Sequence, residues 1–289
     1  MAAISATAVK DLREKTGVGM MEAKKALEET GGDFEKAVDL LRKKGLSAAA
    51  KKAARVASEG MIASFSDGKT GVLIEVNSET DFVAKNEEFQ KFAKDLAKLV
   101  AEKAPADAAA LSRLTLDNGT VEEKRNALVQ KIGENITIRR FERFQTGDSI
   151  ATYLHGTKIG VMVEYTGGDA ELGKDVAMHI AAVNPQYLSR ETVAPDAIAR
   201  ERAICEAQAK ESGKPANIIG KIVDGKMEKF YGDACLLEQV FIKDPDGKQK
   251  VKNLLKAAAV KRFVRLQLGE GIEKKKADFA EEVAAQLQK

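Results

Sequence analysis

Gly71-Val-Leu-Ile-Glu-Val76 has a close counterpart later in the chain, Gly160-Val-Met-Val-Glu-Tyr165. Each segment follows an apolar run and a short turn, and the preceding runs are residues 60–66 and 149–154. Two such runs separated by a few turn residues are typical of an antiparallel β-hairpin. The sequence therefore predicts two related hairpins and an internal repeat in the middle of the chain.

Each predicted hairpin is followed by a helix and a third strand. Apolar residues at helical spacing cover one face of a helix. They are Phe89, Phe92, Ala93, Leu96, Leu99 and Val100 in the first copy, and Val176, Ile180 and Ala181 in the second. Residues 135–141 and 260–266 are expected to close the two sheets. This pattern indicates an α+β fold with a duplicated core, in which each small antiparallel sheet has helices on one face.

Three short helices are expected in residues 5–45, ahead of the duplicated core. Asp33 can cap the third helix, and Gly45 is expected to end it in the left-handed conformation. This three-helix head resembles the ubiquitin-associated (UBA) fold. Residues 47–58 are rich in alanine and lysine, which favours a helical linker. The basic side chains of this linker either face solvent or contact RNA, and the solvated face is the favoured interpretation.

Two further helical regions complete the predicted organisation. Residues 199–211 and 218–230 are separated by a break at 212–215, which indicates an antiparallel helical hairpin suited to contact or dimerisation, in a homodimer or a heterotetramer. Residues 274–289 place Phe279, Val283 and Leu287 on one side of a final helix. The expected domains are a UBA-like head with linker at 1–55, core subdomains at 56–145 and 146–267, the hairpin insertion at about 190–233, and a C-terminal helical module at 268–289.

The residue types argue against an enzyme. The 289 residues include only two histidines and two cysteines, and no tryptophan. The sequence contains no glycine-rich phosphate loop, no Gly-x-Ser-x-Gly elbow and no zinc-binding pair of His or Cys residues. His179 lies in an apolar helical run and is interpreted as a core residue, and Cys205 and Cys235 as buried small groups. No catalytic residue, cofactor or bound metal is therefore expected.

Charge and hydropathy restrict the partners and the location. The chain has 47 basic and 44 acidic residues, a net charge of +3, whereas dedicated nucleic-acid binders carry a strong basic excess. No stretch approaches the ~20 apolar residues that span a bilayer, and the first ten residues lack the pattern of a signal peptide. We expect a cytoplasmic protein that binds another protein, without direct contact with nucleic acid or a membrane.

The two copies differ where the first hairpin meets its helix. The second copy has Thr166-Gly-Gly-Asp169 there, and the first inserts Phe82-Val83 beside Asp81. In one explanation Thr80 or Asp81 caps the helix and Phe82 packs down on it as a hydrophobic staple. In the other, Phe82 is an exposed aromatic next to a charge, which is the composition of an interface hot spot.

Two further positions are candidates for partner contacts. Met20 and Met21 are adjacent, and adjacent helical positions point about 100° apart, so both cannot face a small core. One of them is expected to be half exposed, and one methionine in the core with the other incidental is an equally good account. His155 lies at the turn of the second hairpin, where an exposed turn and a partner contact are equally acceptable explanations.

Two stretches resemble signatures of the bacterial elongation factor Ts family. One runs from Leu12 to Leu27, and the other is Glu75-Val-Asn-Ser-Glu-Thr-Asp-Phe-Val-Ala-Lys85. The order of the expected modules is also similar to that family over nearly the whole chain. The resemblance implies a translation elongation factor that acts as the guanine-nucleotide exchange factor of elongation factor Tu, the GTPase that delivers aminoacyl-tRNA.

The resemblance also implies roles for individual residues. Residues implied to contact the nucleotide-binding domain of elongation factor Tu are Arg13, Met20 and Met21 on one of its helices, and Ile132 and Gly133 near its phosphate loop. Those implied to act near its Mg²⁺ site are Thr80, Asp81, Phe82 and Val83, with Ala84 and Lys85 as further candidates. Phe82 is implied to enter the partner as a wedge that disturbs this site. His155 would reach a second domain. The alternatives, a helical RNA- or ribosome-associated protein and a ubiquitin-like adaptor, leave the Phe82 motif unexplained.

Overall fold

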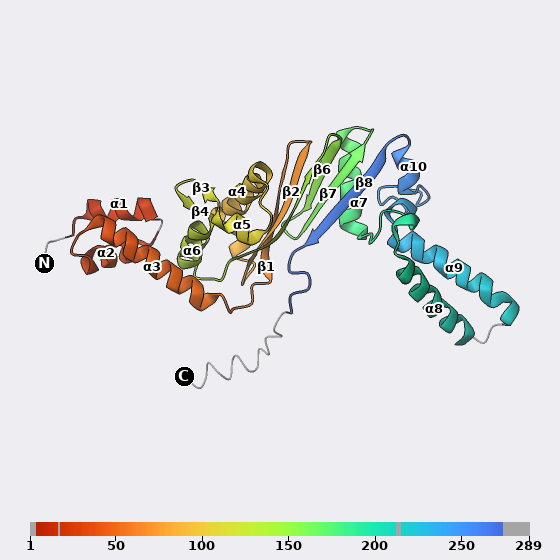
Figure 1. The fold of residues 1–289 in the computed structure, drawn as a ribbon, viewed down its shortest axis with the longest axis horizontal. Coiled ribbons are helices and arrows are strands. Elements are labelled where there is room, and N and C mark those ends of the chain that lie inside the picture. The colour runs from red at the N-terminus through yellow and green to blue at the C-terminus, as the bar shows by residue number, and fades with distance from the viewer. Residues whose placement is uncertain (1–3, 17, 212–214, 274–289) are drawn as a thin grey trace. The chain divides into compact units, whose positions relative to one another are not determined.

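The computed structural model describes residues 4–16, 18–211 and 215–273, and Figure 1 shows the order of their helices and strands. The chain forms two compact units. The described parts of residues 1–63, 74–141 and 267–289 make the first unit, and those of residues 64–73 and 142–266 make the second. The helix expected at 274–289, with Phe279, Val283 and Leu287, lies outside the described residues.

The head contains the three expected helices, α1 (Ala6–Thr16), α2 (Met20–Glu29) and α3 (Phe34–Lys52). Leu12, Ala26 and Leu27 are fully buried between them. The carboxylate of Asp33 accepts a hydrogen bond of 3.1 Å from the backbone N–H of Lys36, so the expected N-cap of α3 is confirmed.

The predicted end of the third helix is wrong. α3 continues through Gly45 to Lys52, and Gly45 does not have a positive φ. The alanine- and lysine-rich sequence that follows has high helix propensity, which outweighs one glycine. Gly45 instead marks a close approach to the helix α6 (Val121–Ile132), because a Cβ atom at this position would lie 2.8 Å from Oε1 of Gln130.

The first sheet has the strand order β1 (Glu59–Ser66), β2 (Thr70–Ser78), β5 (Thr137–Gln145). The hairpin and third strand of the first predicted copy are therefore confirmed. The short 3-10 helix η1 (Val83–Lys85) and the helix α4 (Glu87–Lys103) follow β2. α4 buries one side, on which Phe89, Leu96 and Val100 are fully covered.

Residues 104–132 contain elements that the sequence analysis did not assign. They are α5 (Ala108–Arg113), β3 (Thr115–Leu116), β4 (Gly119–Thr120) and α6. A capping box starts α6, because the Thr120 side chain accepts from the backbone N–H of Glu123 while the Glu123 carboxylate accepts from that of Thr120. Gly133, with φ of 87°, ends it. Both signals are visible in the sequence.

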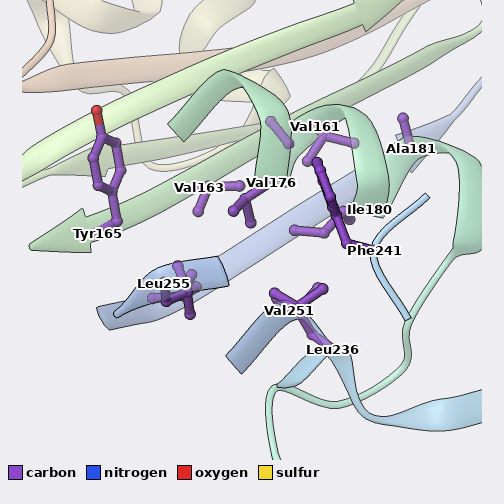
Figure 2. Packing of buried hydrophobic residues seen from close by; sticks show 12 residues of the cluster. Val161, Val163, Tyr165, Val176, Ile180, Ala181, Leu236, Phe241, Val251 and Leu255 are labelled. Atoms are coloured by element: carbon purple, nitrogen blue, oxygen red, sulfur yellow. The ribbon is translucent and has the colours of Figure 1, made fainter. Parts of the chain in front are cut away.

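The second sheet repeats the first, with the order β6 (Ser149–His155), β7 (Ile159–Thr166), β8 (Ala259–Gln267). β6 and β7 are antiparallel, and His155 pairs with Ile159 next to the turn. The helix α7 (Ala170–Val183) packs on β6 and β7. Figure 2 shows the apolar core of this unit, where Val161 and Val163 of β7 meet Val176 and Ile180 of α7.

The insertion between α7 and β8 contains two helices, α8 (Pro195–Glu211) and α9 (Ala216–Ala234), which lie side by side in Figure 1. They pack around Cys205, Ala209, Val223 and Met227. Cys205 and Cys235 are both buried and free, as expected. The remaining short helices of the insertion are η2 (Arg190–Thr192), η3 (Leu236–Glu238) and α10 (Val251–Leu255).

Candidate protein-binding site

The segment of residues 77–86, here called the Phe82 corner, presents an aromatic side chain to solvent. The Phe82 side chain is 75% exposed, whereas Val83 and Ala84 directly after it are buried. Phe82 accepts a backbone hydrogen bond from Lys85, and Val83 accepts one from Asn86. The ring therefore stands on a short hydrogen-bonded turn whose other apolar side chains are packed into the first unit.

The alternative in which Phe82 packs down as a staple is wrong. The N-cap of α4 is Asn86, whose side chain accepts hydrogen bonds from the backbone N–H groups of Glu88 and Phe89. Neither Thr80 nor Asp81 caps this helix. The turn of η1 lies between the end of β2 and the start of α4, with Phe82 as its N-cap residue, and the Phe82 side chain stays exposed.

Charged groups surround the exposed ring. The Lys85 Nζ lies 5.5 Å from the ring centroid of Phe82 and 3.8 Å from a carboxylate oxygen of Asp81. Both charged side chains are more than half exposed, so this ion pair adds little stability. An exposed aromatic flanked by both charges can bind a polar protein surface and still bury apolar area.

Ile132 and Gly133 lie beside the Phe82 corner. A shallow open hollow is lined by both segments; its residues are Phe82, Val83, Asn86, Glu88, Lys131, Ile132 and Glu134. Gly133 ends α6 in the left-handed conformation, so the chain turns immediately after Ile132. The structure thus brings two sequence-predicted groups together in the first unit: Phe82 with Val83, and Ile132 with Gly133.

The methionine pair lies at a second open hollow of the same unit. Met20 and Met21 are 57% and 65% exposed, so the expected exposed methionine is confirmed and the alternative account, with one methionine in the core, is wrong. Ala23, Ala26 and Leu27 already fill that side of α2. The hollow is lined by Arg13, Val18, Gly19, Met20, Glu22, Gln130 and Lys131. Lys131 therefore borders both this hollow and the one beside Phe82.

The two histidines have different environments. His155 is exposed at the end of β6, and its Nδ1 lies 3.4 Å from the hydroxyl of Tyr153. His179 is fully buried. Its Nδ1 accepts from the backbone N–H of Ile242, and its Nε2 lies 3.0 Å from Oε1 of Gln239. Burial lowers the pKa of His179, although the Gln239 bond opposes the change. The predicted core role of His179 is confirmed.

The described residues contain no cluster of His, Cys, Asp or Glu side chains that could hold a metal ion. No helix in the described part of the chain is long and apolar enough to cross a membrane. On the basic helix α3, several cations have acidic neighbours: Arg42 lies 2.7 Å from Glu123 and Lys44 lies 2.7 Å from Glu29. These ion pairs reduce the free positive charge available for RNA.

Comparison with known proteins assigns the family. The family model described as "Elongation factor TS" matches residues 79–270, which include Phe82 and residues 79–86 of its corner. The proteins named elongation factor Ts from Burkholderia multivorans and Burkholderia mallei are 56% and 55% identical to this chain, and each match covers 99% of this chain and 98% of the relative.

The chain belongs to the elongation factor Ts family. As a member of this family it is a translation elongation factor of protein biosynthesis. Sequence reasoning about the elongation factor Ts motifs selected Phe82 and Met20, which are exposed, but it missed the polar residues around the corner. Glu79, Glu134 and Asn135 were not selected, because single polar residues in loops carry no periodic signal.

Proposed function

We propose that this chain is a non-enzymatic guanine-nucleotide exchange factor that binds elongation factor Tu and promotes GDP release, so that GTP can rebind. The observation that carries the proposal is the 75% exposed ring of Phe82 on a packed turn, in a chain of the elongation factor Ts family. An exposed ring on a packed support can enter a partner without first unfolding its own unit.

The Phe82 tip would act as a wedge near the Mg²⁺ site of the GTPase. Mg²⁺ requires near-octahedral coordination and bridges the phosphates to the protein, so its displacement weakens nucleotide binding. Thr80, Asp81 and Val83 would accompany Phe82, and Lys85 is exposed enough to join them. Ala84 is buried and would act as support. A ~10⁴-fold faster release needs about 5.5 kcal/mol, within reach of one aromatic anchor and a lost metal contact.

The remaining contacts would hold the partner in place. Arg13, Met20 and Met21 would dock on its nucleotide domain, and Ile132 with Gly133 would lie near its phosphate loop. His155 would contact a second domain. Because the factor prefers the empty GTPase, nucleotide binding would in turn expel the factor.

We also propose how the chain is organised, how it assembles and where it works. The three-helix head would be UBA-like, and the α8–α9 pair would be a hairpin used for contact or for assembly as a homodimer or heterotetramer. The chain would work in the cytoplasm, without direct contact with nucleic acid or a membrane. The domain boundaries would lie at about residues 55, 145 and 267.

The decisive experiment measures release of labelled GDP from elongation factor Tu with and without this chain. Intact protein is expected to accelerate release strongly, and Phe82→Ala is expected to remove most of the acceleration while the thermal unfolding midpoint stays unchanged. Asp246→Ala, a change in an exposed turn of the second unit, is the matched surface control. Wild-type release with Phe82→Ala would reject the wedge, and no acceleration by intact protein would reject the exchange function.

A further inference from the structure

Two carboxylates tie the Phe82 corner to the loop after α6 in a reciprocal way. Glu134 accepts hydrogen bonds from both the backbone N–H and the hydroxyl of Thr80, at 2.9 and 2.6 Å. In the opposite direction, Glu79 accepts a hydrogen bond of 2.6 Å from the backbone N–H of Asn135. Each loop therefore supplies a carboxylate to the backbone of the other, and we call these three bonds the carboxylate clamp.

The clamp fixes Thr80 two residues before Phe82. Besides its bonds to Glu134, Thr80 offers its carbonyl oxygen to the hydroxyl of Ser78, at 2.9 Å. The backbone N–H, the carbonyl and the side chain of this exposed residue are therefore all hydrogen-bonded. On the other side of Phe82, the turn is held by backbone bonds to Lys85 and Asn86.

Neighbouring contacts hold the same loop from other directions. Lys131, at the end of α6, donates a hydrogen bond of 2.5 Å to Glu88 at the start of α4. Asn135 is buried and donates from its side chain to the carbonyl oxygen of Arg55, at 2.8 Å. The loop after α6 is thus anchored to the first unit, and Glu134 transmits that anchorage to the Phe82 corner.

We infer that Glu134 is a positioning residue for nucleotide exchange, which holds the exposed Phe82 tip in the orientation that enters the partner. This inference rests on the proposed exchange function. Glu134 lines the hollow beside Phe82, is partly buried, and gives both carboxylate oxygens to Thr80, so it would act through Thr80. Hydrogen bonds to a charged acceptor are about twice as strong as neutral ones, and a preformed tip avoids the cost of ordering the corner on binding.

The first test uses GDP release from elongation factor Tu at saturating exchange factor. Glu134→Ala removes both acceptors and is expected to slow release about tenfold or more. Glu134→Gln keeps the shape of the side chain and can still accept from the Thr80 N–H. Its rate of GDP release is therefore expected to lie between those of wild type and Glu134→Ala. The matched control is Glu142→Ala, an exposed carboxylate on β5 with no bond to the corner, and it should release GDP at the wild-type rate.

A double-mutant comparison separates positioning from direct contact. If Glu134 acts only by orienting the ring, then Glu134→Ala should have no further effect when Phe82 is already alanine. If Glu134 itself contacted the partner, the two losses would multiply, and that result would overturn the inference.

A second measurement needs no partner. The chain has no tryptophan and four tyrosines, so Phe82→Trp gives a single tryptophan at the tip. Excited at a wavelength that tyrosine does not absorb, its time-resolved anisotropy reports local mobility. Added Glu134→Ala is expected to lower the residual anisotropy of this residue, whereas added Glu142→Ala should not change it. Thr80→Val, which removes only the hydroxyl bond, provides a second route if Glu134→Ala does not fold.

The outcomes are distinct. Unchanged anisotropy after Glu134→Ala, or GDP release within about twofold of wild type, contradicts a positioning role for Glu134. If Phe82→Ala itself releases GDP at the wild-type rate, the proposed wedge fails. In that case the anisotropy still decides whether Glu134 orders the corner.

Discussion

Arg140 and Arg262 occupy equivalent places in the third strands of the two sheets, and each has its Nε 2.6 Å from a buried carboxylate. Arg140 pairs with Glu75, which is fully buried, and Arg262 pairs with Glu164, which is 7% exposed. The internal repeat thus extends from the backbone to one ion pair. Burial alone would raise the pKa of Glu75, but hydrogen bonds from Gly269, Arg140 and other donors outweigh it, and the pKa is lowered.

Removing either arginine should destabilise the fold, because a charged carboxylate would remain buried with fewer donors. We expect Arg140→Ala and Arg262→Ala each to lower the free energy of unfolding by about 2 kcal/mol. Urea unfolding followed by far-ultraviolet circular dichroism measures this. Arg113→Ala, a change at an exposed position of α5, is the control and should stay within about 0.5 kcal/mol of wild type.

The lowered pKa of the buried Glu238 carboxylate predicts that the fold loses stability in acid. Hydrogen bonds from Lys250, Arg190 and Lys252 outweigh burial and lower the pKa of Glu238 from 4.5 to about 2. Because the folded-state pKa is depressed, this contribution is present above pH 4.5 and is lost as the pH falls toward about 2. Unfolding midpoints of wild type and Glu238→Gln should therefore converge between these pH values. Parallel acid curves for the two proteins would contradict the assignment.

The head methionines should affect binding and not folding. Met20→Ala with Met21→Ala removes two side chains that are more than half exposed, so the thermal unfolding midpoint should hardly change. If they dock on elongation factor Tu, the affinity measured by titration calorimetry should fall about tenfold or more. Leu27→Ala, at a fully buried position of the same helix, should instead unfold the head, and the same behaviour in the methionine variant would assign the pair to the core.

Lys256 is held in a backbone conformation that favours glycine, with φ of 51° and ψ of −108°. It is the second residue of a turn closed by a hydrogen bond of 2.8 Å from the N–H of Ala258 to the carbonyl of Leu255. Lys256→Gly should raise the free energy of unfolding by about 1 kcal/mol, because relief of strain exceeds the entropy cost of glycine. Lys256→Ala keeps the strain, so an equal gain with alanine would show that the backbone is not the cause.

The sequence was most informative where a pattern repeats. The repeated apolar segments of β2 and β7, the helical spacing in α4 and the turn at His155 predicted the two sheets and the helix of the first copy. Strands buried on both faces are continuous apolar runs, and a helix with one buried face repeats its apolar residues every three to four positions. The end of α3 was mispredicted at Gly45, since the propensity of the following alanines and packing on α6 outweigh a local stop signal.

The candidate site was only partly predictable for a related reason. Exposed Phe82 and Met21 stand out as apolar residues in polar surroundings, and the family resemblance selected them. Their support comes from contacts between distant residues, such as Glu134 with Thr80 and Lys131 with Glu88. No local spacing predicts such pairs, because they depend on how α6 returns to the end of β2.

The corresponding corner of the second copy, which contains Gly167 and Gly168, is closely packed. A Cβ atom at Gly167 would lie 3.2 Å from the Cα of Ala258, and one at Gly168 would lie 2.5 Å from Leu172. Both glycines therefore lie close to other atoms of their own unit, so a larger residue at either position would require the residues just before β8 or the Leu172 side chain to move. An aromatic side chain that protrudes, as Phe82 does from the first corner, therefore has no room at the two glycines of the second.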